Sequence, residues 1–357
     1  MKTSVFLESH NLKNRAGGLG TFNYELIKAL SQKPTQDLEI YLNTKYPEQL
    51  SKEFGDKFKY QKYHSLHRHS LFRLRGKYDV WHSMNQNTKI EPFYKPKNYV
   101  LTIHDVNFVE EHSSDMSHRS NQLFMKKLER ADVITYISNF AKEQTHRYFK
   151  VPNVEEKIIY NGNPITHFLN TENFIPTVPI DKPFFYSIGD FIERKNFISI
   201  IKMMKEIPDF NLIISGNNDK EYGLEVKNFI IENHLENRVF LTGKVDDIGK
   251  QFYMKNCVAF LFPSIREGFG LPPIEAMRFE KPVFLSNKTS LPEIGGDAAF
   301  YWEDFDPTYM KEILFDKLSY FENNKALQKE KLLERSLFFN WDKAAAEYLD
   351  CYRKIIV

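Results

Sequence analysis

Residues 259–279 read AFLFPSIREGFGLPPIEAMRF: a short apolar run, a glycine-rich turn and the start of an amphipathic helix. The run Ala259–Phe262 has the length and composition of a buried strand, and the pattern that follows predicts a helix near Ile274–Phe279. A strand followed closely by a helix is half of a βαβ unit. The stretch therefore predicts a parallel α/β sheet, in which ligands bind at the carboxyl ends of the strands.

The same alternation of short apolar runs and amphipathic stretches extends along the whole chain. It predicts strands at Ser4–Leu7, Leu38–Leu42, Val80–Ser83, Tyr99–Ile103, Val133–Ile137, Lys157–Tyr160, Phe184–Ile188, Asn211–Ser215, Val239–Leu241 and Val283–Leu285. It predicts helices near Thr21–Leu30, His118–Arg130, Asn139–Phe149, Lys195–Glu206, Glu221–Asn233, Pro307–Phe321 and Trp341–Ile355. The fold class is therefore α/β with doubly wound parallel sheets.

The length of 357 residues predicts two domains of ordinary size. Three prolines interrupt the pattern within residues 170–183, which we interpret as an interdomain linker. We expect an N-terminal domain at 1–172, a C-terminal domain at 173–338 and a final helix at 339–357. Two doubly wound domains joined in this way would place a ligand cleft between the carboxyl ends of their strands.

Composition and charge exclude several classes of protein. The chain is 27 % charged and 42 % hydrophobic, which is typical of globular proteins. Residues 1–175 carry a net charge of +6, which is too weak to indicate nucleic-acid binding. The two cysteines, Cys257 and Cys351, have no metal or redox spacing, and no apolar run is long enough to span a membrane. Since the first residues predict a strand rather than a signal peptide, we expect a cytoplasmic protein.

The first chemical motif is Ala16-Gly-Gly-Leu-Gly20, between the first strand and the helix near Thr21. Glycines let a ligand approach the backbone, and a helix N-terminus offers N–H groups to an anion. The spacing is not that of a dinucleotide-binding fingerprint. An ordinary tight turn explains the glycines equally well.

The second motif, Gly189-Asp-Phe-Ile-Glu-Arg-Lys-Asn196, follows the first strand of the second half. Arg194 can bind two phosphate oxygens at once, and Lys195 adds a compact charge, so the pair suits a diphosphate. A solvated charge pair is the structural alternative, but cations are disfavoured at helix starts.

The third motif, Glu267-Gly-Phe-Gly-Leu-Pro-Pro-Ile-Glu275, is the most specific in the chain. Its two carboxylates can accept hydrogen bonds from the paired hydroxyls of sugars and riboses. Glu275 alone could be a partner of the helix dipole, but that interpretation leaves Glu267 and both glycines unexplained.

In this order the three motifs resemble the retaining glycosyltransferases of family 4, with the GT-B architecture. The resemblance covers most of the chain and implies two Rossmann-like domains facing across a cleft, with a C-terminal helix that crosses back to the N-terminal domain. The segments that carry it are Gly17-Gly-Leu-Gly20, Thr102-Ile-His-Asp105, Thr135-Tyr-Ile-Ser-Asn-Phe140, Asn161-Gly162, Gly189 with Arg194-Lys-Asn196, Gly243-Lys-Val245, the Glu267 and Glu275 pair, Lys281-Pro-Val283, Leu291-Pro-Glu-Ile294 and Asn340-Trp-Asp342.

The resemblance also implies roles for individual residues. Arg194 and Lys195 would hold the donor diphosphate close to Gly18, Glu275 would bind the ribose, and Glu267 would bind the transferred sugar. The catalytic residues it implies are His104, Arg194, Lys195 and Glu267. The donor-binding residues it implies are Gly17, Gly18, Gly189, Lys244, Val245, Gly268, Phe269, Gly270, Leu271 and Glu275. It implies no cofactor and no metal, because the two cations take the place of a divalent ion, and we add Asp105 as a candidate for orienting the acceptor.

These residues fit glycosyl transfer chemically. Cations on the leaving phosphates stabilise the charge that develops there, and one lost preorganised contact of this kind costs about 3–4 kcal/mol. The sequence offers no obvious nucleophile for the anomeric carbon. We therefore favour a same-face mechanism, in which the leaving phosphate takes the proton of the acceptor.

The segment 59–77 contains six Lys or Arg, three His and no acidic residue, interleaved with aromatic and leucine side chains. Such a stretch could rest on an anionic membrane surface, where each basic residue contributes roughly 1 kcal/mol. It could also bind an acidic acceptor, or be a solvated loop. If the segment binds a membrane, we expect the protein to lie at the inner face of that membrane.

Two further patterns are interpreted structurally. Asp304-Phe-Asp306 looks like a metal-binding Asp-x-Asp pair, but it precedes Pro307 at a helix start, so we expect a helix cap. Four histidines have no metal-ligand spacing and are predicted to be ordinary surface or loop residues: His10, His82, His112 and His118.

The leading function is transfer of a sugar, with mannose from GDP-mannose as the best candidate, to a saccharide or lipid-linked saccharide in surface polysaccharide synthesis of the O-antigen or capsule type. UDP-linked donors are the near alternative. A nucleotide-sugar epimerase of the same fold is disfavoured by Arg194, Lys195 and the Glu267 and Glu275 pair. A catalytically silent nucleotide-sugar-binding subunit is the alternative of another class.

Overall fold

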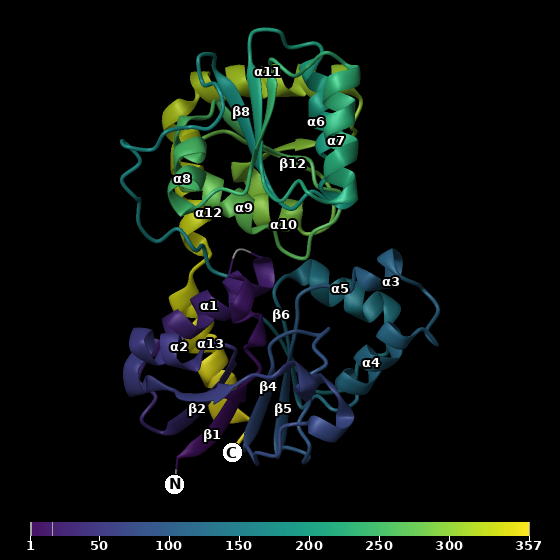
Figure 1. The fold of residues 1–357 in the computed structure, drawn as a ribbon, viewed down its shortest axis with the longest axis vertical. Coiled ribbons are helices and arrows are strands. Elements are labelled where there is room, and N and C mark those ends of the chain that lie inside the picture. The colour runs from purple at the N-terminus through teal and green to yellow at the C-terminus, as the bar shows by residue number, and fades with distance from the viewer. Residues whose placement is uncertain (1, 16, 357) are drawn as a thin grey trace. The chain divides into compact units, whose positions relative to one another are not determined.

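The computed structural model describes residues 2–15 and 17–356. Two compact units divide the chain (Figure 1): unit 1 is Met1–Pro164 with Asn340–Val357, and unit 2 is Ile165–Phe339. The division comes eight residues before the predicted boundary at 172. Ile165 is buried in the core of unit 2, and the backbone N–H of Leu169 donates to Gln251 Oε1 over 2.9 Å, so this stretch packs with unit 2.

Unit 1 contains a seven-stranded parallel sheet in the order β3-β2-β1-β4-β5-β6-β7. Its strands are β1 (Thr3–Leu7), β2 (Leu38–Thr44), β3 (Lys59–Lys62), β4 (Val80–Ser83), β5 (Asn98–Ile103), β6 (Val133–Tyr136) and β7 (Glu155–Ile158). The central strands β1 and β4 are buried on both faces, as parallel sheets covered by helices require.

Helices cover both faces of this sheet (Figure 1). They are α1 (Gly18–Ser31), α2 (Pro47–Phe54), α3 (Phe108–Glu111), α4 (Arg119–Leu128), α5 (Asn139–Tyr148) and α13 (Trp341–Lys354). Four 3₁₀ segments accompany them: η1 (His10–Asn14), η2 (Gly55–Lys57), η3 (Ser65–Arg68) and η4 (Ser70–Phe72). Helices α3, α4 and α5 pack on one face, and α13 lies beside α1, where the rings of Tyr348 and Phe22 meet edge to face.

Unit 2 contains a six-stranded parallel sheet in the order β10-β9-β8-β11-β12-β13. Its strands are β8 (Phe184–Ile188), β9 (Asn211–Ser215), β10 (Val239–Gly243), β11 (Ala259–Phe262), β12 (Val283–Ser286) and β13 (Phe300–Trp302). Its helices are α6 (Phe197–Met204), α7 (Glu221–Glu232), α8 (Asp247–Asn256), α9 (Leu271–Met277), α10 (Leu291–Gly295), α11 (Pro307–Asn323) and α12 (Lys325–Phe338), with 3₁₀ segments η5 (Glu193–Lys195) and η6 (Gly296–Ala298).

Two apolar cores lie on opposite faces of this second sheet. One is formed with α6, α7 and α11, and the other with α8, α9 and α12 (Figure 1). Both units are therefore doubly wound parallel α/β sheets, which confirms the fold class predicted from the alternation of elements.

Each sheet has a point at which its strand order reverses. In unit 1 the chain proceeds outward from β1 to β2 and β3, then returns to β4 on the other side of β1. In unit 2 the same reversal separates β8 from β11. Loops that leave such neighbouring strands in opposite directions open a crevice at the carboxyl edge, where ligands bind. The fold therefore directs attention to the loops after β1 and β4 and after β8 and β11.

Two of the four histidines expected at surface or loop positions are buried. His82 is fully buried in β4, where Nδ1 lies 2.7 Å from Tyr352 Oη and Nε2 lies 2.7 Å from Thr102 Oγ1. These bonds tie α13 to the sheet, so His82 is a core residue. His10 is also buried, and its Nδ1 is hydrogen bonded to Glu8. The prediction of a surface or loop position was wrong for His82, because a lone histidine carries no periodic signal. His10 lies in the connection between β1 and α1, and His112 and His118 are exposed as expected.

Asp306 caps a helix as predicted. Its Oδ1 accepts hydrogen bonds from the backbone N–H groups of Thr308 at 3.1 Å and Tyr309 at 3.0 Å, at the start of α11. Asp304 accepts from the backbone N–H of Asp306 over 2.7 Å. The Asp-Phe-Asp pair thus serves the helix start.

Candidate functional site

The reversal point of unit 2 brings together the second and third motifs. Gly189 follows β8 directly, and the loop ends in η5 with Arg194 and Lys195. Lys195 is buried, and its Nζ lies 4.7 Å from the centre of the Phe262 ring at the end of β11. A Cβ atom at Gly189 would lie 3.3 Å from Lys195 Cε, so glycine leaves room for the lysine side chain to fold back over the strand end.

Arg194, Lys195 and Glu267 form one ionic cluster. Lys195 Nζ donates to Glu267 Oε1 over 2.5 Å, and Arg194 Nη1 lies 3.2 Å from Glu267 Oε2. Ser264 Oγ also donates to Glu267 Oε1, over 2.7 Å. Two residues that the sequence assigned to the diphosphate are therefore in direct contact with the one assigned to the sugar.

The electrostatics of the cluster keep Glu267 ionised. Burial alone raises the pKa of a carboxyl, but the charges of Lys195 and Arg194 outweigh burial here, so the pKa of Glu267 lies below its usual value. Burial lowers the pKa of Lys195, and Glu267 offsets only part of that effect. Arg194 Nη1 also donates to the carbonyl oxygen of Arg266 over 2.8 Å, which fixes the guanidinium next to the glycine-rich loop.

The hydroxyl groups of two neighbouring residues, Thr289 and Ser290, hold the Gly268–Gly270 loop in place. Ser290 Oγ donates to the carbonyl oxygens of Glu267 at 3.0 Å and Phe269 at 2.9 Å, and Thr289 Oγ1 accepts from the backbone N–H of Glu267 at 3.0 Å. Gly270 has φ +107°, which an L side chain rarely adopts, and it precedes Leu271 at the first position of α9. The backbone N–H groups of this turn are consequently held in place at a strand end.

Glu275 is buried inside α9 and has its own cation. Lys250 Nζ donates to Glu275 Oε1 over 3.1 Å, and it also lies 3.3 Å from Asp247 Oδ1. Burial lowers the pKa of a lysine, but the two carboxylates outweigh burial, so the pKa of Lys250 is raised. Glu275 therefore belongs to a second ionic group, centred on Lys250.

The predicted base-binding stretch follows β10. Lys244 is exposed, and Val245 is half-buried against the core of unit 2. The backbones at three neighbouring strand ends are linked here: the N–H of Gly189 donates to Ser215 O over 3.0 Å, and the N–H of Gly216 donates to Gly243 O over 2.8 Å. Hydrogen bonds thus join the backbones that follow β8, β9 and β10 along the carboxyl edge of the sheet.

In unit 1 the glycine motif lies at the start of α1. Ala16 lies outside the described residues. Gly17 is the N-cap of α1, and a Cβ atom at Gly18 would meet nothing within 4 Å. At Gly20 a Cβ atom would lie 1.8 Å from Asn14 O, so this glycine is required by close backbone packing. The motif combines one structural glycine with one that faces open space.

His104 directly follows β5 and is buried. Its Nε2 lies 2.9 Å from Met84 O, and its ring meets Phe22 edge to face at 4.6 Å. Because a carbonyl oxygen only accepts, Nε2 carries the proton and Nδ1 is left as an acceptor. Burial lowers the pKa of His104 to about 4, so the ring is neutral at pH 7. Asp105 Oδ1 accepts from the backbone N–H of Asn107 over 3.1 Å.

Residues 170–330 match the family model described as glycosyl transferases group 1. The segment belongs to the group 1 glycosyltransferases. The chain is 22 % identical over 393 residues to O-antigen chain mannosyltransferase B of Escherichia coli, covering 98 % of this chain and 99 % of the relative. It is 27 % identical over 208 residues to the O-antigen chain mannosyltransferase RfbU of Salmonella typhimurium, covering 57 % and 56 % of the two chains.

Two solved structures resemble this chain over nearly its whole length. A sucrose-phosphate synthase from Thermosynechococcus elongatus superposes with a TM-score of 0.72 at 19 % identity, covering 99 % of each chain. Anabaena HepE, solved in complex with UDP and glucose, superposes with a TM-score of 0.70 at 17 % identity, covering 99 % of this chain and 100 % of the other. At these identities the likeness shows the fold, which is that of the GT-B glycosyltransferases.

The sequence did not predict several partners of the glycosyltransferase site. Lys250 pairs with Glu275, and Ser264, Thr289 and Ser290 hold Glu267 and its loop. Ser264 lies three residues before Glu267, so its proximity could have been inferred from the strand–loop pattern. The other partners come from α8 and from the loop after β12, and their sequence surroundings carry no signal.

The cluster in unit 2 can hold an anion and a hydroxyl-bearing ligand at one strand end. Arg194 and Lys195 supply donors and positive charge, and Glu267 supplies acceptors. In the described part of the chain no three His, Cys, Asp or Glu residues are grouped as metal ligands would be. Nor does any described helix combine the length and apolarity needed to cross a bilayer.

Proposed function

We propose that the protein transfers a sugar, with mannose from GDP-mannose as the favoured donor, to a saccharide acceptor with retention of anomeric configuration. The observation that carries the proposal is the buried cluster of Arg194, Lys195 and Glu267 at the reversal point of unit 2. The two curated mannosyltransferase relatives support mannose and O-antigen-type polysaccharide as the context. A UDP-linked sugar is the second candidate, since HepE of the same fold was solved with UDP.

In the proposed reaction the bond between the anomeric carbon and the leaving phosphate oxygen breaks. The acceptor oxygen forms its new bond on the same face of the sugar, and its proton passes to the leaving phosphate. The products are the glycoside and the nucleoside diphosphate, so atoms and charges balance. Arg194 and Lys195 would stabilise the negative charge that grows on the leaving group.

Other residues would position the substrates. Glu267 and the Gly268–Leu271 backbone would bind sugar hydroxyls, with Phe269 beside them, and Glu275 would accept from the ribose hydroxyls. His104 would accept a hydrogen bond from a sugar hydroxyl at Nδ1, since its neutral ring donates only through Nε2. Gly17, Gly18 and Gly189 would let the phosphates approach the backbone, Lys244 and Val245 would contact the base, and Asp105 would orient the acceptor. No metal or cofactor is required in this scheme.

A thermal-shift panel tests the donor site. UDP, GDP, ADP, dTDP and CMP are added to the full chain with and without EDTA. A ligand at about 100 times its dissociation constant adds roughly 2.7 kcal/mol of stability. We expect GDP to give the largest shift and EDTA to leave it unchanged. No shift with any nucleotide would contradict the assignment and favour a catalytically silent subunit.

Hydrolysis of a donor sugar tests the role of Arg194 and Lys195. The donor used is the one whose nucleotide gives the largest thermal shift. Replacing Arg194 by Ala should lower turnover by about 10²–10³, the effect of losing one preorganised contact to developing charge. Lys255→Ala is the matched control, since Lys255 is exposed in unit 2 and has no ion pair among the described residues. Trapping of a covalent glycosyl-enzyme would contradict the same-face mechanism.

The segment 59–77 would let the protein rest on an anionic membrane at the inner face of the cell envelope. Three of its apolar side chains are solvent-exposed: Leu66 by 53 %, Leu71 by 79 % and Phe72 by 52 %. Exposed apolar side chains next to basic ones are what an interfacial segment requires. Replacing Leu71 and Phe72 by Ser should reduce pelleting with phosphatidylglycerol vesicles, and unchanged pelleting would contradict the contact.

A further inference from the structure

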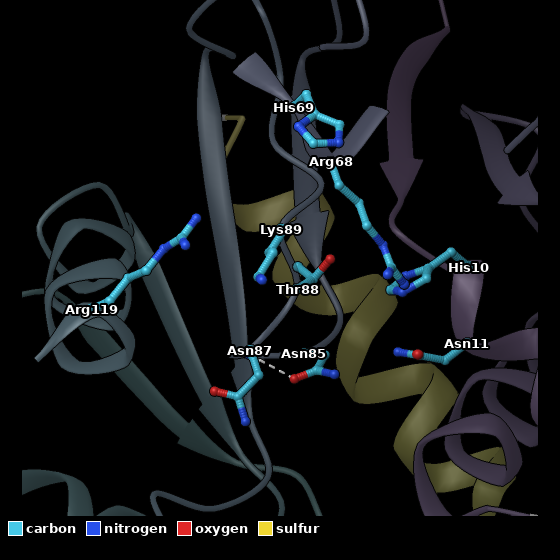
Figure 2. Close-up of a pocket in the computed structure, with 9 residues that line it drawn as sticks. All are labelled: His10, Asn11, Arg68, His69, Asn85, Asn87, Thr88, Lys89 and Arg119. Atoms are coloured by element: carbon cyan, nitrogen blue, oxygen red, sulfur yellow. Dashed lines mark hydrogen bonds between the residues drawn. The ribbon is translucent and has the colours of Figure 1, made fainter. Parts of the chain in front are cut away.

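The reversal point of unit 1 opens into a hollow of about 410 Å³, a volume typical of ligand sites. Figure 2 shows its lining: His10 and Asn11 follow β1, the 85–89 loop follows β4, and Arg68 and Arg119 reach it from η3 and from the start of α4. Both strands that flank the reversal therefore contribute residues. This is the position at which an open α/β sheet binds its ligand.

The lining is rich in cations and contains no carboxylate. Arg68, Lys89 and Arg119 approach the hollow from three different segments (Figure 2). None of the three forms an ion pair with any of residues 2–15 or 17–356. Like charges gathered around one hollow repel each other, so the arrangement favours an anionic ligand.

Two further observations point to an anion. Asn11 Nδ2, a buried amide nitrogen of the lining, has no hydrogen-bond acceptor among the described residues, and such a donor is costly to leave unsatisfied. Arg119 occupies the first position of the ten-residue helix α4, where the helix dipole disfavours a cation. An anion in the hollow would relieve both penalties.

The basic surface continues into an adjoining hollow of about 310 Å³. It shares Arg68, Lys89 and Arg119 with the first hollow and adds Arg73 and Lys126. Its one carboxylate, Glu91, is already matched by Arg130 at 2.5 Å and Lys127 at 3.3 Å. Apolar groups lie beside these charges: Leu123 lines the hollow, and Leu71 and Phe72 are exposed on the turn between two lining residues, Ser70 and Arg73.

We propose that this hollow binds a phosphoryl group, phosphate or diphosphate, carried by the acceptor, with Arg68, Lys89, Arg119 and Asn11 as its ligands. The inference rests on the proposed glycosyl transfer and names the chemical class of its acceptor. The phosphoryl group can come from a lipid-linked saccharide or from a soluble phosphorylated saccharide, and the same cations serve both.

The test compares two double variants of the full chain. Lys89→Gln/Arg119→Gln removes two pocket charges, and both side chains are exposed, so folding should be retained. Lys52→Gln/Lys57→Gln removes the same charge from exposed positions of unit 1 outside the hollow. Inorganic diphosphate and farnesyl diphosphate are titrated calorimetrically with saturating nucleoside diphosphate present. We expect the pocket variant to bind at least tenfold more weakly, and the control to change less than twofold.

The two probes distinguish the source of the phosphoryl group. A lipid-linked acceptor would be indicated if farnesyl diphosphate bound at least tenfold more tightly than inorganic diphosphate. This gain in affinity should then be lost in the Leu71→Ser/Phe72→Ser variant. Equal binding of the two probes would indicate a soluble phosphorylated one. Either result supports the pocket, provided the Lys89→Gln/Arg119→Gln variant loses it.

Three results would overturn the proposal. They are unchanged binding of both diphosphates by the pocket variant, an equal loss in the Lys52→Gln/Lys57→Gln control, and a loss confined to phosphatidylglycerol vesicles, which would make the cations a membrane surface. Failure of the proposed function is seen separately, since it removes the nucleotide thermal shift and donor hydrolysis. Those two measurements should be unchanged in the pocket variant, whose residues lie outside the donor site.

Discussion

Both units are doubly wound parallel sheets, but the charged residues at their reversal points are arranged differently. In unit 2 the loops after β8 and β11 bring Lys195 and Arg194 within 3.2 Å of Glu267. In unit 1 the loops after β1 and β4 gather Arg68, Lys89 and Arg119 around a hollow whose lining has no carboxylate. One reversal point pairs its cations with a carboxylate, and the other leaves its cations without one.

The difference follows from burial. Lys195 and Glu267 are both buried, and an unpaired buried charge costs several kcal/mol, so each needs the other for the fold to persist. The three unit 1 cations reach solvent, where an unpaired charge is cheap. Unit 2 therefore carries a preorganised cluster whose members can exchange partners with a ligand, whereas unit 1 keeps its cations available for one.

Removing the carboxylate of the paired cluster should have the largest effect. Glu267→Ala leaves Lys195 buried beside Arg194 alone, and we expect unit 2 to lose about 3–5 kcal/mol of unfolding free energy. Hydrogen exchange followed by mass spectrometry would report the loss in peptides of β8 and β11. Adding Lys195→Met to the Glu267→Ala variant removes the orphaned charge, so stability should largely return.

The corresponding change in unit 1 provides the contrast. Arg119→Gln removes an exposed charge that has no ion-pair partner among the described residues, and the free energy of unfolding should change by less than about 0.5 kcal/mol. If Glu267→Ala were equally harmless, or if Arg119→Gln destabilised unit 1 by several kcal/mol, the distinction between the two reversal points would be wrong.

Lowering the pH should have the next largest effect, and it should destabilise unit 1 more than unit 2. Burial lowers the pKa of His82 to about 3 and of His104 to about 4, whereas the two histidines of unit 2, His167 and His234, are exposed. In the unfolded chain a histidine has a pKa near 6.5. Below that pH the unfolded chain binds protons that His82 and His104 of the folded unit 1 do not bind, so the stability of unit 1 falls as the pH falls. Between pH 7.5 and pH 5.5 we expect unit 1 to lose about 2–3 kcal/mol through these two groups.

Hydrogen exchange corrected for the intrinsic pH dependence would measure this loss unit by unit. His82→Gln should remove about half of the acid sensitivity of unit 1, at the cost of a lower stability at pH 7.5. An equal loss in both units, with no effect of the His82 substitution, would show that other groups dominate acid unfolding.

The glycines of unit 1 provide the smallest and most local comparison. Gly20→Ala forces a Cβ atom to within 1.8 Å of Asn14 O, and should destabilise the protein by about 1–3 kcal/mol. Gly18→Ala meets nothing within 4 Å, and alanine in a helix is worth up to about 1 kcal/mol over glycine, so its melting temperature should hold or rise. A drop in transferase activity of the Gly18 variant alone would indicate that a donor phosphate approaches this backbone.

Sequence patterns located the central strands accurately, found the edge strands β7 and β10, and missed the other two edge strands. The strands β4, β8, β9 and β11 have the predicted bounds, because a strand buried on both faces is a continuous apolar run. The strands β3 and β13 were not predicted, and each lies at the edge of its sheet. In β3, Lys59 and Lys62 are exposed, so its sequence resembles a solvated loop. Helices α2, α3, α8, α10 and α12 were also missed.

The sequence by itself determined the alternating α/β pattern, the glycine turns and the acidic and basic residues that follow the strands, since these depend on neighbours along the chain. Only the tertiary structure decided which of them meet. Lys195 and Glu267 are 72 residues apart in the chain and meet at neighbouring strand ends, α8 supplies Lys250 for Glu275, and four segments converge on the unit 1 hollow. The burial that makes His82 a core residue and Glu267 an obligate partner is a property of the packed fold, because it depends on neighbours that the local sequence does not name.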